Sequence, residues 1–180
     1  MIKQIIVYYW RVCLLRESPE NTPYSRFLLG LSSIIFALIL IIQWRFSNGV
    51  LGNNFSITVI ASSSLILSYI LYTYILLFVR GFTPRLVQTL TCLFCVRIII
   101  HCIASPLFLF DPYLAHIHSK NPLFLFIGVI YLFVTLGLSV WQFFITAHIY
   151  KYALSTSAIQ SVLAAFGVLA VNILTVSLWR

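Results

Sequence analysis

Five long stretches with almost no charged side chains limit the folds open to this chain more than any other feature. A helix that crosses the hydrocarbon core of a bilayer needs about 20 mostly apolar residues. Of the 180 residues, 62% are hydrophobic and 8% are charged, whereas soluble domains carry about 25% charged residues. The chain therefore predicts an all-α, polytopic membrane protein whose main partner is the lipid bilayer.

The five predicted spans make up a transmembrane domain over residues 27–180. Their ranges are 27–44, 55–79, 86–106, 122–147 and 157–179. Trp44 and Arg45 close the first span as interface anchors. In the third span, Ser105 and Pro106 predict an end or a kink, because proline lacks the backbone donor that a helix needs.

Residues 1–26 precede the first span and are predicted to lie on the cytoplasmic membrane surface. Apolar residues recur at helical spacing over 1–16, so we expect an amphipathic interfacial helix there. The proline-containing entry segment that follows holds two of the three acidic residues of the chain. A simple turn into the first span is one interpretation of it. The other is a cytoplasmic contact segment, with the candidate residues Glu17, Pro19, Glu20, Pro23, Tyr24 and Arg26.

The basic residues predict the orientation of the chain. Seven of the eleven lie on one side of the predicted spans and three on the other, while Arg97 lies within a span. Lys and Arg concentrate in cytoplasmic loops, so we expect a cytoplasmic N-terminus and a C-terminus outside. The net charge of +8 comes from residues scattered singly along the chain. Because they form no basic patch, a nucleic-acid partner is not expected.

Arg97 and His101 are the costliest features of the third span. They are four residues apart and share one face of the helix. A charged side chain at this depth costs at least a few kcal/mol and is a functional candidate by default. One interpretation is a face that meets an anion or a proton, and the other is a structural arginine satisfied by neighbouring side chains. No acidic residue lies in any predicted span, so the candidate partners are Ser62, Ser63, Ser64, Gln142 and Asn172.

Cys92 and Cys95 have the spacing of a thiol redox pair. Membrane thiol oxidoreductases usually relay electrons through a second pair, and the remaining cysteines, Cys13 and Cys102, do not form one in the sequence. Cysteine is also an ordinary small residue of membrane helices. A redox function is therefore only a further alternative.

The chain offers little for catalysis. Its acidic residues, Glu17, Glu20 and Asp111, all lie outside the predicted spans and form no pair suited to acid–base chemistry. His116 and His118 beside Asp111 are a weak metal pattern, and a solvated loop is the better interpretation. We predict that the protein is not an enzyme and that it needs no cofactor or metal.

The stretch SVWQFFITAHIYKYALSTSAIQSVLAAF resembles the fourth helix, short basic turn and small-residue fifth helix of bacterial members of the Yip domain family. The matched positions are Trp141, His148, Ala153 and Ser157. The entry LLRESPENTPYSR and the five-span plan are also similar to that family. The resemblance implies a multi-pass protein of the cell membrane, here the bacterial inner membrane. Eukaryotic members of the family associate with Rab GTPases and vesicle transport.

Three hypotheses about function follow from the sequence. The first is a non-enzymatic scaffold, assembly or trafficking-type protein, similar to the Yip family, that binds a protein partner or a second copy of itself within the membrane. The second is a small transporter or channel subunit that uses the face of Arg97 and His101. The third is a membrane thiol oxidoreductase that uses Cys92 and Cys95.

Overall fold

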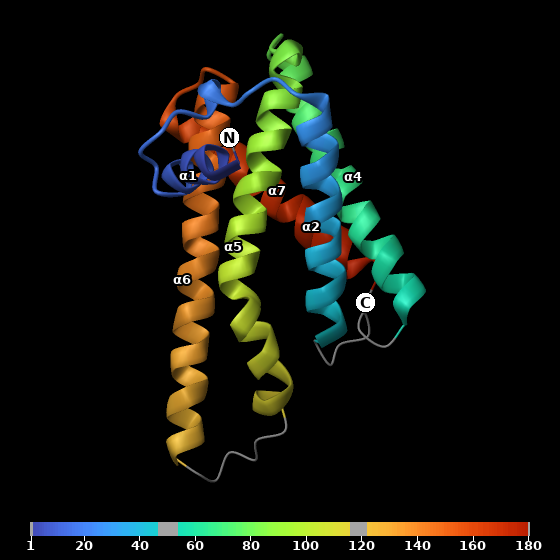
Figure 1. Ribbon diagram of the computed structural model, residues 1–180. Coiled ribbons are helices and arrows are strands. Elements are labelled where there is room, and N and C mark those ends of the chain that lie inside the picture. Colours follow the sequence, from blue (N-terminus) through green and yellow to red (C-terminus); the bar gives the residue numbers. More distant parts are fainter. Residues whose placement is uncertain (1, 47–53, 116–121, 180) are drawn as a thin grey trace.

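The computed structural model describes residues 2–46, 54–115 and 122–179, and all the regular structure in these ranges is helical (Figure 1). The elements are α1 (Ile2–Cys13), η1 (Pro19–Asn21), α2 (Arg26–Phe46), α4 (Phe55–Val79), η2 (Thr83–Arg85), α5 (Leu86–Ala115), α6 (Pro122–Ala153) and α7 (Ala158–Ser177). Within the described ranges, α2, α4, α5, α6 and α7 are long and apolar enough to cross a membrane. The predicted all-α, five-span architecture is confirmed.

The five long helices form a ring. Following the contacts, α2 packs on α4, α4 on α7, α7 on α6, α6 on α5, and α5 on α2. Helix α5 also contacts α4 and α1, which makes it the central element of the bundle. Helix α1 and η1 lie over one end of the bundle, next to the start of α5 and the end of α6 (Figure 1). We name this end, covered by residues 2–22, the capped end.

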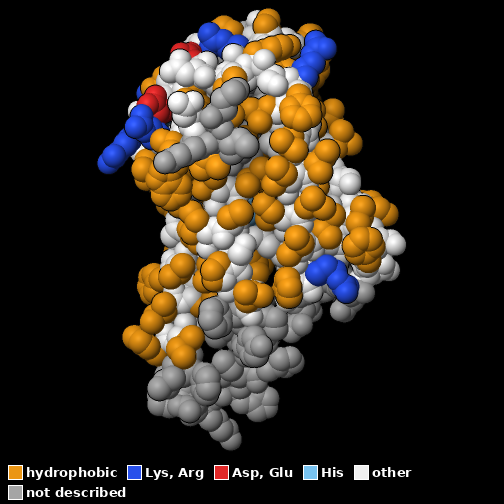
Figure 2. Space-filling view, viewed as in Figure 1, with side chains coloured by type: hydrophobic (Ala, Val, Ile, Leu, Met, Phe, Trp, Pro, Cys, Tyr) orange, Lys and Arg blue, Asp and Glu red, His pale blue; other side chains and the backbone are white. Residues whose placement is uncertain are grey.

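The outer surface of the ring is apolar. Phe27, Val79 and Ile159 expose 80%, 75% and 76% of their surface, and hydrophobic side chains cover much of the visible face below the capped end (Figure 2). The acidic side chains and most of the basic ones in this view gather at the capped end. Such a surface is compatible with a bilayer around the long helices and an aqueous boundary at the capped end.

Three helix ends at the capped end close with the same turn. The second residue after each helix has a left-handed backbone, with φ 59° at Leu15, 74° at Gly81 and 48° at Ser155. In each case the next N–H donates to a carbonyl five residues earlier, at 2.8 to 3.1 Å. This turn satisfies carbonyls that the helix leaves without a partner. Glycine signals it in the sequence because glycine adopts positive φ without strain, whereas Leu15 and Ser155 give no such signal.

The predicted span limits hold best where the sequence contains an end signal. Helix α4 has the predicted bounds of 55–79, and α2 and α7 differ from 27–44 and 157–179 by one or two residues at each end. The helix of the fourth span continues past the predicted limit at 147, and α6 ends at Ala153. Polar residues such as His148 and Lys151 mark a boundary in polarity, but they do not stop a helix. The left-handed residue Ser155 does.

The third span also continues beyond its predicted end at 106. Helix α5 reaches Ala115 through Pro106, and its lower part turns away from the line of its upper part (Figure 1). The hydroxyl of Ser105 and the amide of Gln43 both donate to the carbonyl of His101, at 2.9 and 2.8 Å. Side chains of this kind let a membrane helix tolerate a proline, because they bond backbone groups near the break.

Candidate intramembrane site at Arg97

Arg97 lies near the middle of the membrane-spanning part of α5 and exposes only 5% of its surface. Eleven residues separate it from Leu86, which is about 16 Å along a helix, or about half of a 30 Å hydrocarbon core. Its guanidinium carbon lies 4.1 Å from the centroid of the Tyr69 ring on α4. A desolvated cation over an aromatic face gains about 2 kcal/mol. An aromatic ring therefore positions the charge.

The edge of the Arg97 guanidinium is not used within the described chain. Its Nε is buried and has no hydrogen-bond partner there. The two acidic side chains that the structure describes, Glu17 and Glu20, pair with Arg11 and Arg85 instead. A buried charge without a counter-charge costs several kcal/mol. The described chain thus supplies no counter-charge for this cation.

Arg97 lines a cavity of about 160 Å³ between α5, α6 and α7. The other polar residues around it are Ser139, Gln142, Thr146 and Asn172, and the larger apolar ones are Phe143, Val168 and Leu169. A protein cavity of about 150 Å³ can hold one benzene molecule. There is room beside the guanidinium for a molecule of about six heavy atoms.

Asn172 on α7 contributes a second unpaired group to this cavity. Its amide nitrogen donates to the hydroxyl oxygen of Tyr69, and its Oδ1 is buried without a partner. Tyr69 therefore orients Arg97 with its ring and Asn172 with its hydroxyl. A ligand that accepts from Nε of Arg97 and donates to Oδ1 of Asn172 would satisfy both.

His101 lies one turn beyond Arg97 but is bonded to a different helix. Its Nδ1 is 2.7 Å from Oε1 of Gln43 on α2, and its ring packs at 5.4 Å on that of Phe36. His101 also lines a cavity of about 180 Å³ between α5 and α6. Arg97 and His101 therefore do not share a bonding partner among the described residues. Gln142 lines both the Arg97 cavity and the His101 cavity.

A stripe of polar residues on α6 connects the two cavities. They recur every three or four residues and therefore share one face of the helix; they are Tyr131, Thr135, Ser139, Gln142 and Thr146. The first four line the His101 cavity and the last three line the Arg97 cavity. The spacing is visible in the sequence, but polar residues at helical spacing can also face another chain or lipid. Of the five, our sequence prediction named only Gln142.

The predicted partners of Arg97 are brought to it only in part. Gln142 and Asn172 line its cavity. The predicted serines of α4 lie elsewhere, and their hydroxyls donate to carbonyls of their own helix, those of Val59 and Ala61. Tyr69, the residue that holds Arg97, had no signal in the sequence, because it is one of ten tyrosines.

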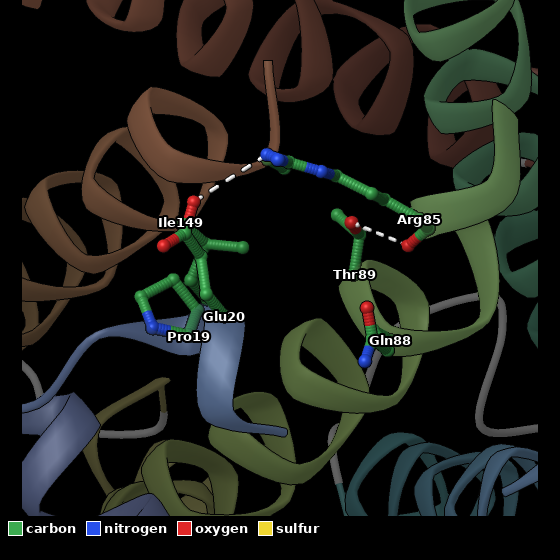
Figure 3. Close-up of a pocket in the computed structure, with 7 residues that line it drawn as sticks. Pro19, Glu20, Arg85, Gln88, Thr89 and Ile149 are labelled. Atoms are coloured by element: carbon green, nitrogen blue, oxygen red, sulfur yellow. Dashed lines mark hydrogen bonds and ion pairs between the residues drawn. The ribbon is translucent and has the colours of Figure 1, made fainter. Parts of the chain in front are cut away.

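The entry segment folds onto the capped end of its own bundle. Pro19 and Thr22 are buried, and Nε2 of Gln88 donates to the carbonyl of Thr22 at 3.2 Å. Oε1 of Glu20 pairs with Nη1 of Arg85 at 3.4 Å. These contacts border a cavity of about 260 Å³ (Figure 3). Part of the predicted contact segment therefore contacts α5 and α6.

The other predicted contact residues do not line this cavity. Glu17 pairs with Arg11 at 3.4 Å, and its carbonyl oxygen is 3.3 Å from Nε2 of His148. Pro23, Tyr24 and Arg26 are exposed.

The predicted N-terminal helix is present as α1, and its apolar stripe rests on protein. Tyr9, Val12 and Cys13 are buried. Nε1 of Trp141 on α6 donates to the carbonyl of Cys13 at 3.0 Å. The hydroxyl of Tyr8 donates to the backbone carbonyl of Ser18 at 2.7 Å. Helix α1 thus belongs to the folded bundle.

The cysteines of the predicted redox pair lie beneath α1. All four cysteines are free thiols, Cys92 is buried and Cys95 is half-buried. Burial, with a smaller contribution from the neighbouring Cys95, raises the pKa of the Cys13 thiol of α1 to about 12. A thiol that stays protonated at neutral pH is a poor nucleophile. The redox function stays a prediction, which thiol trapping of a Cys92–Cys95 disulfide would test.

His116 and His118 lie outside the described residues. In comparisons with known proteins, no family model, no curated protein and no solved structure matches the chain. The resemblance to the Yip domain family stays a prediction from the sequence.

Proposed function

We propose that the protein is a small transporter that binds a monocarboxylate at Arg97 and carries it across the membrane. One observation carries this proposal. Arg97 is buried at mid-membrane depth, lines a cavity of about 160 Å³, and has no carboxylate partner among the described residues. An ionisable residue so placed marks a ligand path more readily than a structural contact.

The chemistry of the cavity favours a carboxylate with a single charge. A guanidinium presents planar N–H donors that match the two oxygens of a carboxylate. Tyr69 covers the face of the guanidinium and leaves the edge for such a ligand. One cation neutralises one negative charge, and a second would stay uncompensated in a medium of low dielectric constant. Phe143, Val168 and Leu169 offer apolar contacts to a short carbon chain.

The distribution of cavities supports a transporter that opens to one side at a time. The polar stripe of α6 leads from Arg97 toward the end of the bundle opposite the cap. Toward the cap, the interface of α5 and α6 is filled by the buried side chains of Leu93, Ile145 and Ile149. Transporters with a central site alternate between two such states. In the orientation that the basic residues predict, the capped end faces the cytoplasm of a bacterial cell and the C-terminus lies outside.

The scaffold hypothesis loses part of its support. Its motivation included the entry segment as a surface for another protein, yet Pro19, Glu20 and Thr22 contact the chain's own bundle. Neither function needs a catalytic group. A protein partner or a second copy within the membrane stays a prediction.

Uptake of radiolabelled lactate into liposomes that contain the purified protein tests the proposal. Lactate has a single carboxylate and six heavy atoms, and it crosses lipid slowly as an anion. We expect Arg97→Gln to reduce uptake at least tenfold, because the site then has no cation. Arg80→Gln is the matched control, since the exposed Arg80 side chain lines none of the cavities described above and its Nη2 donates to Oε1 of Gln160. Unchanged uptake by Arg97→Gln, or no uptake by the folded wild-type protein, would overturn the proposal.

A further inference from the structure

A second arginine, Arg85 in η2 directly before α5, also faces a cavity between α5 and α6. Arg85 lines the capped-end cavity with Gln88, Thr89 and Ile149 (Figure 3). Pro19 and Glu20 of the entry segment cover the other side of this cavity. Because twelve residues separate Arg85 from Arg97, the two charges lie about 18 Å apart along the helix.

The Arg85 side chain is held in place and still has free donors. Its Nη1 donates to the carbonyl of Tyr152 at 3.0 Å and to the hydroxyl of Ser155 at 3.1 Å, and its guanidinium carbon lies 5.0 Å from the centroid of the Phe82 ring. Every hydrogen bond that this guanidinium makes within the described chain uses Nη1. Nε and Nη2 remain available to a carboxylate, which could bind in the bidentate geometry that guanidinium groups favour.

The Glu20 carboxylate contacts this arginine only weakly. The two side chains reach toward each other across the cavity (Figure 3), but the shortest distance is 3.4 Å, and 50% of the Glu20 side chain and 37% of the Arg85 side chain are exposed. An ion pair with this exposure contributes at most about 1 kcal/mol. Glu20 therefore acts as an internal carboxylate that another carboxylate could replace.

We propose that the capped-end cavity is a second carboxylate site, at which a substrate carboxylate displaces Glu20 from Arg85. This inference rests on the proposed transport function for the identity of the ligand. Thr89 and Leu93 lie between the two arginines at four-residue steps, and this row turns by about 120° around the helix axis from Arg85 to Arg97. Residues of α6 line the cavities at both ends of the row. A substrate that passes Leu93 from Arg97 reaches Arg85 next. Glu20 then weakens binding at the cytoplasmic side and favours release.

Binding of lactate to the purified protein in detergent micelles, measured by calorimetry, tests this site separately. Every variant is made in an Arg97→Gln background, so that only the capped-end site remains. We expect Glu20→Gln to tighten binding about two- to fivefold, because it removes a competitor that contributes at most about 1 kcal/mol. Adding Arg85→Gln should abolish binding. Glu17→Gln is the matched control, since Glu17 forms an ion pair of the same length, with Arg11, outside the cavity.

The outcomes separate the two proposals. If neither the Arg97→Gln protein nor its Glu20→Gln derivative binds lactate, the second site is wrong, while transport is still judged by uptake in the wild-type protein. If Glu17→Gln raised the affinity for lactate as much as Glu20→Gln, the gain would come from net charge alone. That result would overturn the proposal that lactate displaces Glu20. Lactate binding in nanodiscs of two lipid compositions distinguishes a free carboxylate from a lipid headgroup as the ligand. Loss of lactate binding in phosphatidylglycerol but not in phosphatidylcholine would assign the cavity to a headgroup and contradict the proposal.

Discussion

The guanidinium carbon of Arg97 lies 4.1 Å above the ring of Tyr69, and the hydroxyl of the same tyrosine accepts a hydrogen bond from Asn172. One aromatic side chain therefore sets the position of a cation from α5 and an amide from α7. Nε of Arg97 and Oδ1 of Asn172 both stay without a partner in the described chain. Arg97 is thus held by an aromatic ring, while its Nε has no partner in the described chain.

Replacing Arg97 by methionine should stabilise the protein in the absence of ligand. The change removes a buried charge without a counter-ion and keeps most of the side-chain volume, so we expect the free energy of unfolding to rise by about 1 kcal/mol or more. Lactate should raise the melting temperature of the wild-type protein, because a ligand that binds only the folded state stabilises it. It should raise the melting temperature of Arg97→Met by less, because only the capped-end site then remains. If Arg97→Met is instead less stable without lactate, the arginine is a structural residue.

Tyr69 should affect ligand affinity through its ring more than through its hydroxyl. Tyr69→Leu removes the aromatic face under Arg97, and we expect it to weaken lactate binding about tenfold, which corresponds to about 1.4 kcal/mol. Tyr69→Phe keeps the ring and removes only the acceptor for Asn172, so its effect should be smaller. Calorimetry on the two variants checks the order. A larger loss in Tyr69→Phe would contradict the role assigned to the ring.

Asn172 should give the site a preference for a carboxylate with a neighbouring hydroxyl. Lactate can donate to the unpaired Oδ1 of Asn172, whereas propionate cannot, and one hydrogen bond contributes about 1 kcal/mol. We expect lactate to bind about fivefold more tightly than propionate to the wild-type protein. In Asn172→Leu the two affinities should become equal, as competition binding would measure. If Asn172→Leu still preferred lactate to propionate, the lactate hydroxyl would bind to a group other than Asn172.

Gly167 should tolerate no side chain while Tyr72 keeps its place. A Cβ at position 167 would overlap the hydroxyl of Tyr72, which donates to the carbonyl of Ala164 at 2.9 Å. Gly167→Ala must therefore displace Tyr72 from this bond, and we expect a loss of about 1–3 kcal/mol in unfolding free energy. Gly137→Ala is the control, because no atom lies within 4 Å of its Cβ position.

A second variant separates this clash from a loss of helix flexibility. In a Tyr72→Leu background the hydroxyl is gone, so the further cost of Gly167→Ala should fall close to zero. A full additional loss in that background would show that Tyr72 is not the cause. Denaturant unfolding in micelles gives the unfolding free energies of the wild type, Gly167→Ala, Tyr72→Leu and the double variant.

The entry segment illustrates the limit of a sequence pattern. Its prolines and acidic residues marked it as unusual, and the sequence predicted correctly that a helix precedes it. The pattern left open whether this segment is a simple turn into the first span or a contact segment. The contact of Glu20 with Arg85 joins residues that are 65 positions apart, and such a distance is decided by how helices pack and not by local composition.

The sequence by itself determined that the chain forms five membrane-length helices and that one of them carries an arginine without an acidic partner in any span. Helix length and polarity are local properties of the sequence, and the thickness of the bilayer sets which helices are long and apolar enough to span it. The tertiary structure alone decided that Tyr69, Gln142 and Asn172, on three different helices, meet at Arg97. Their meeting depends on the order and packing of α4, α5, α6 and α7, because side chains so far apart in sequence come together only when those helices interlock.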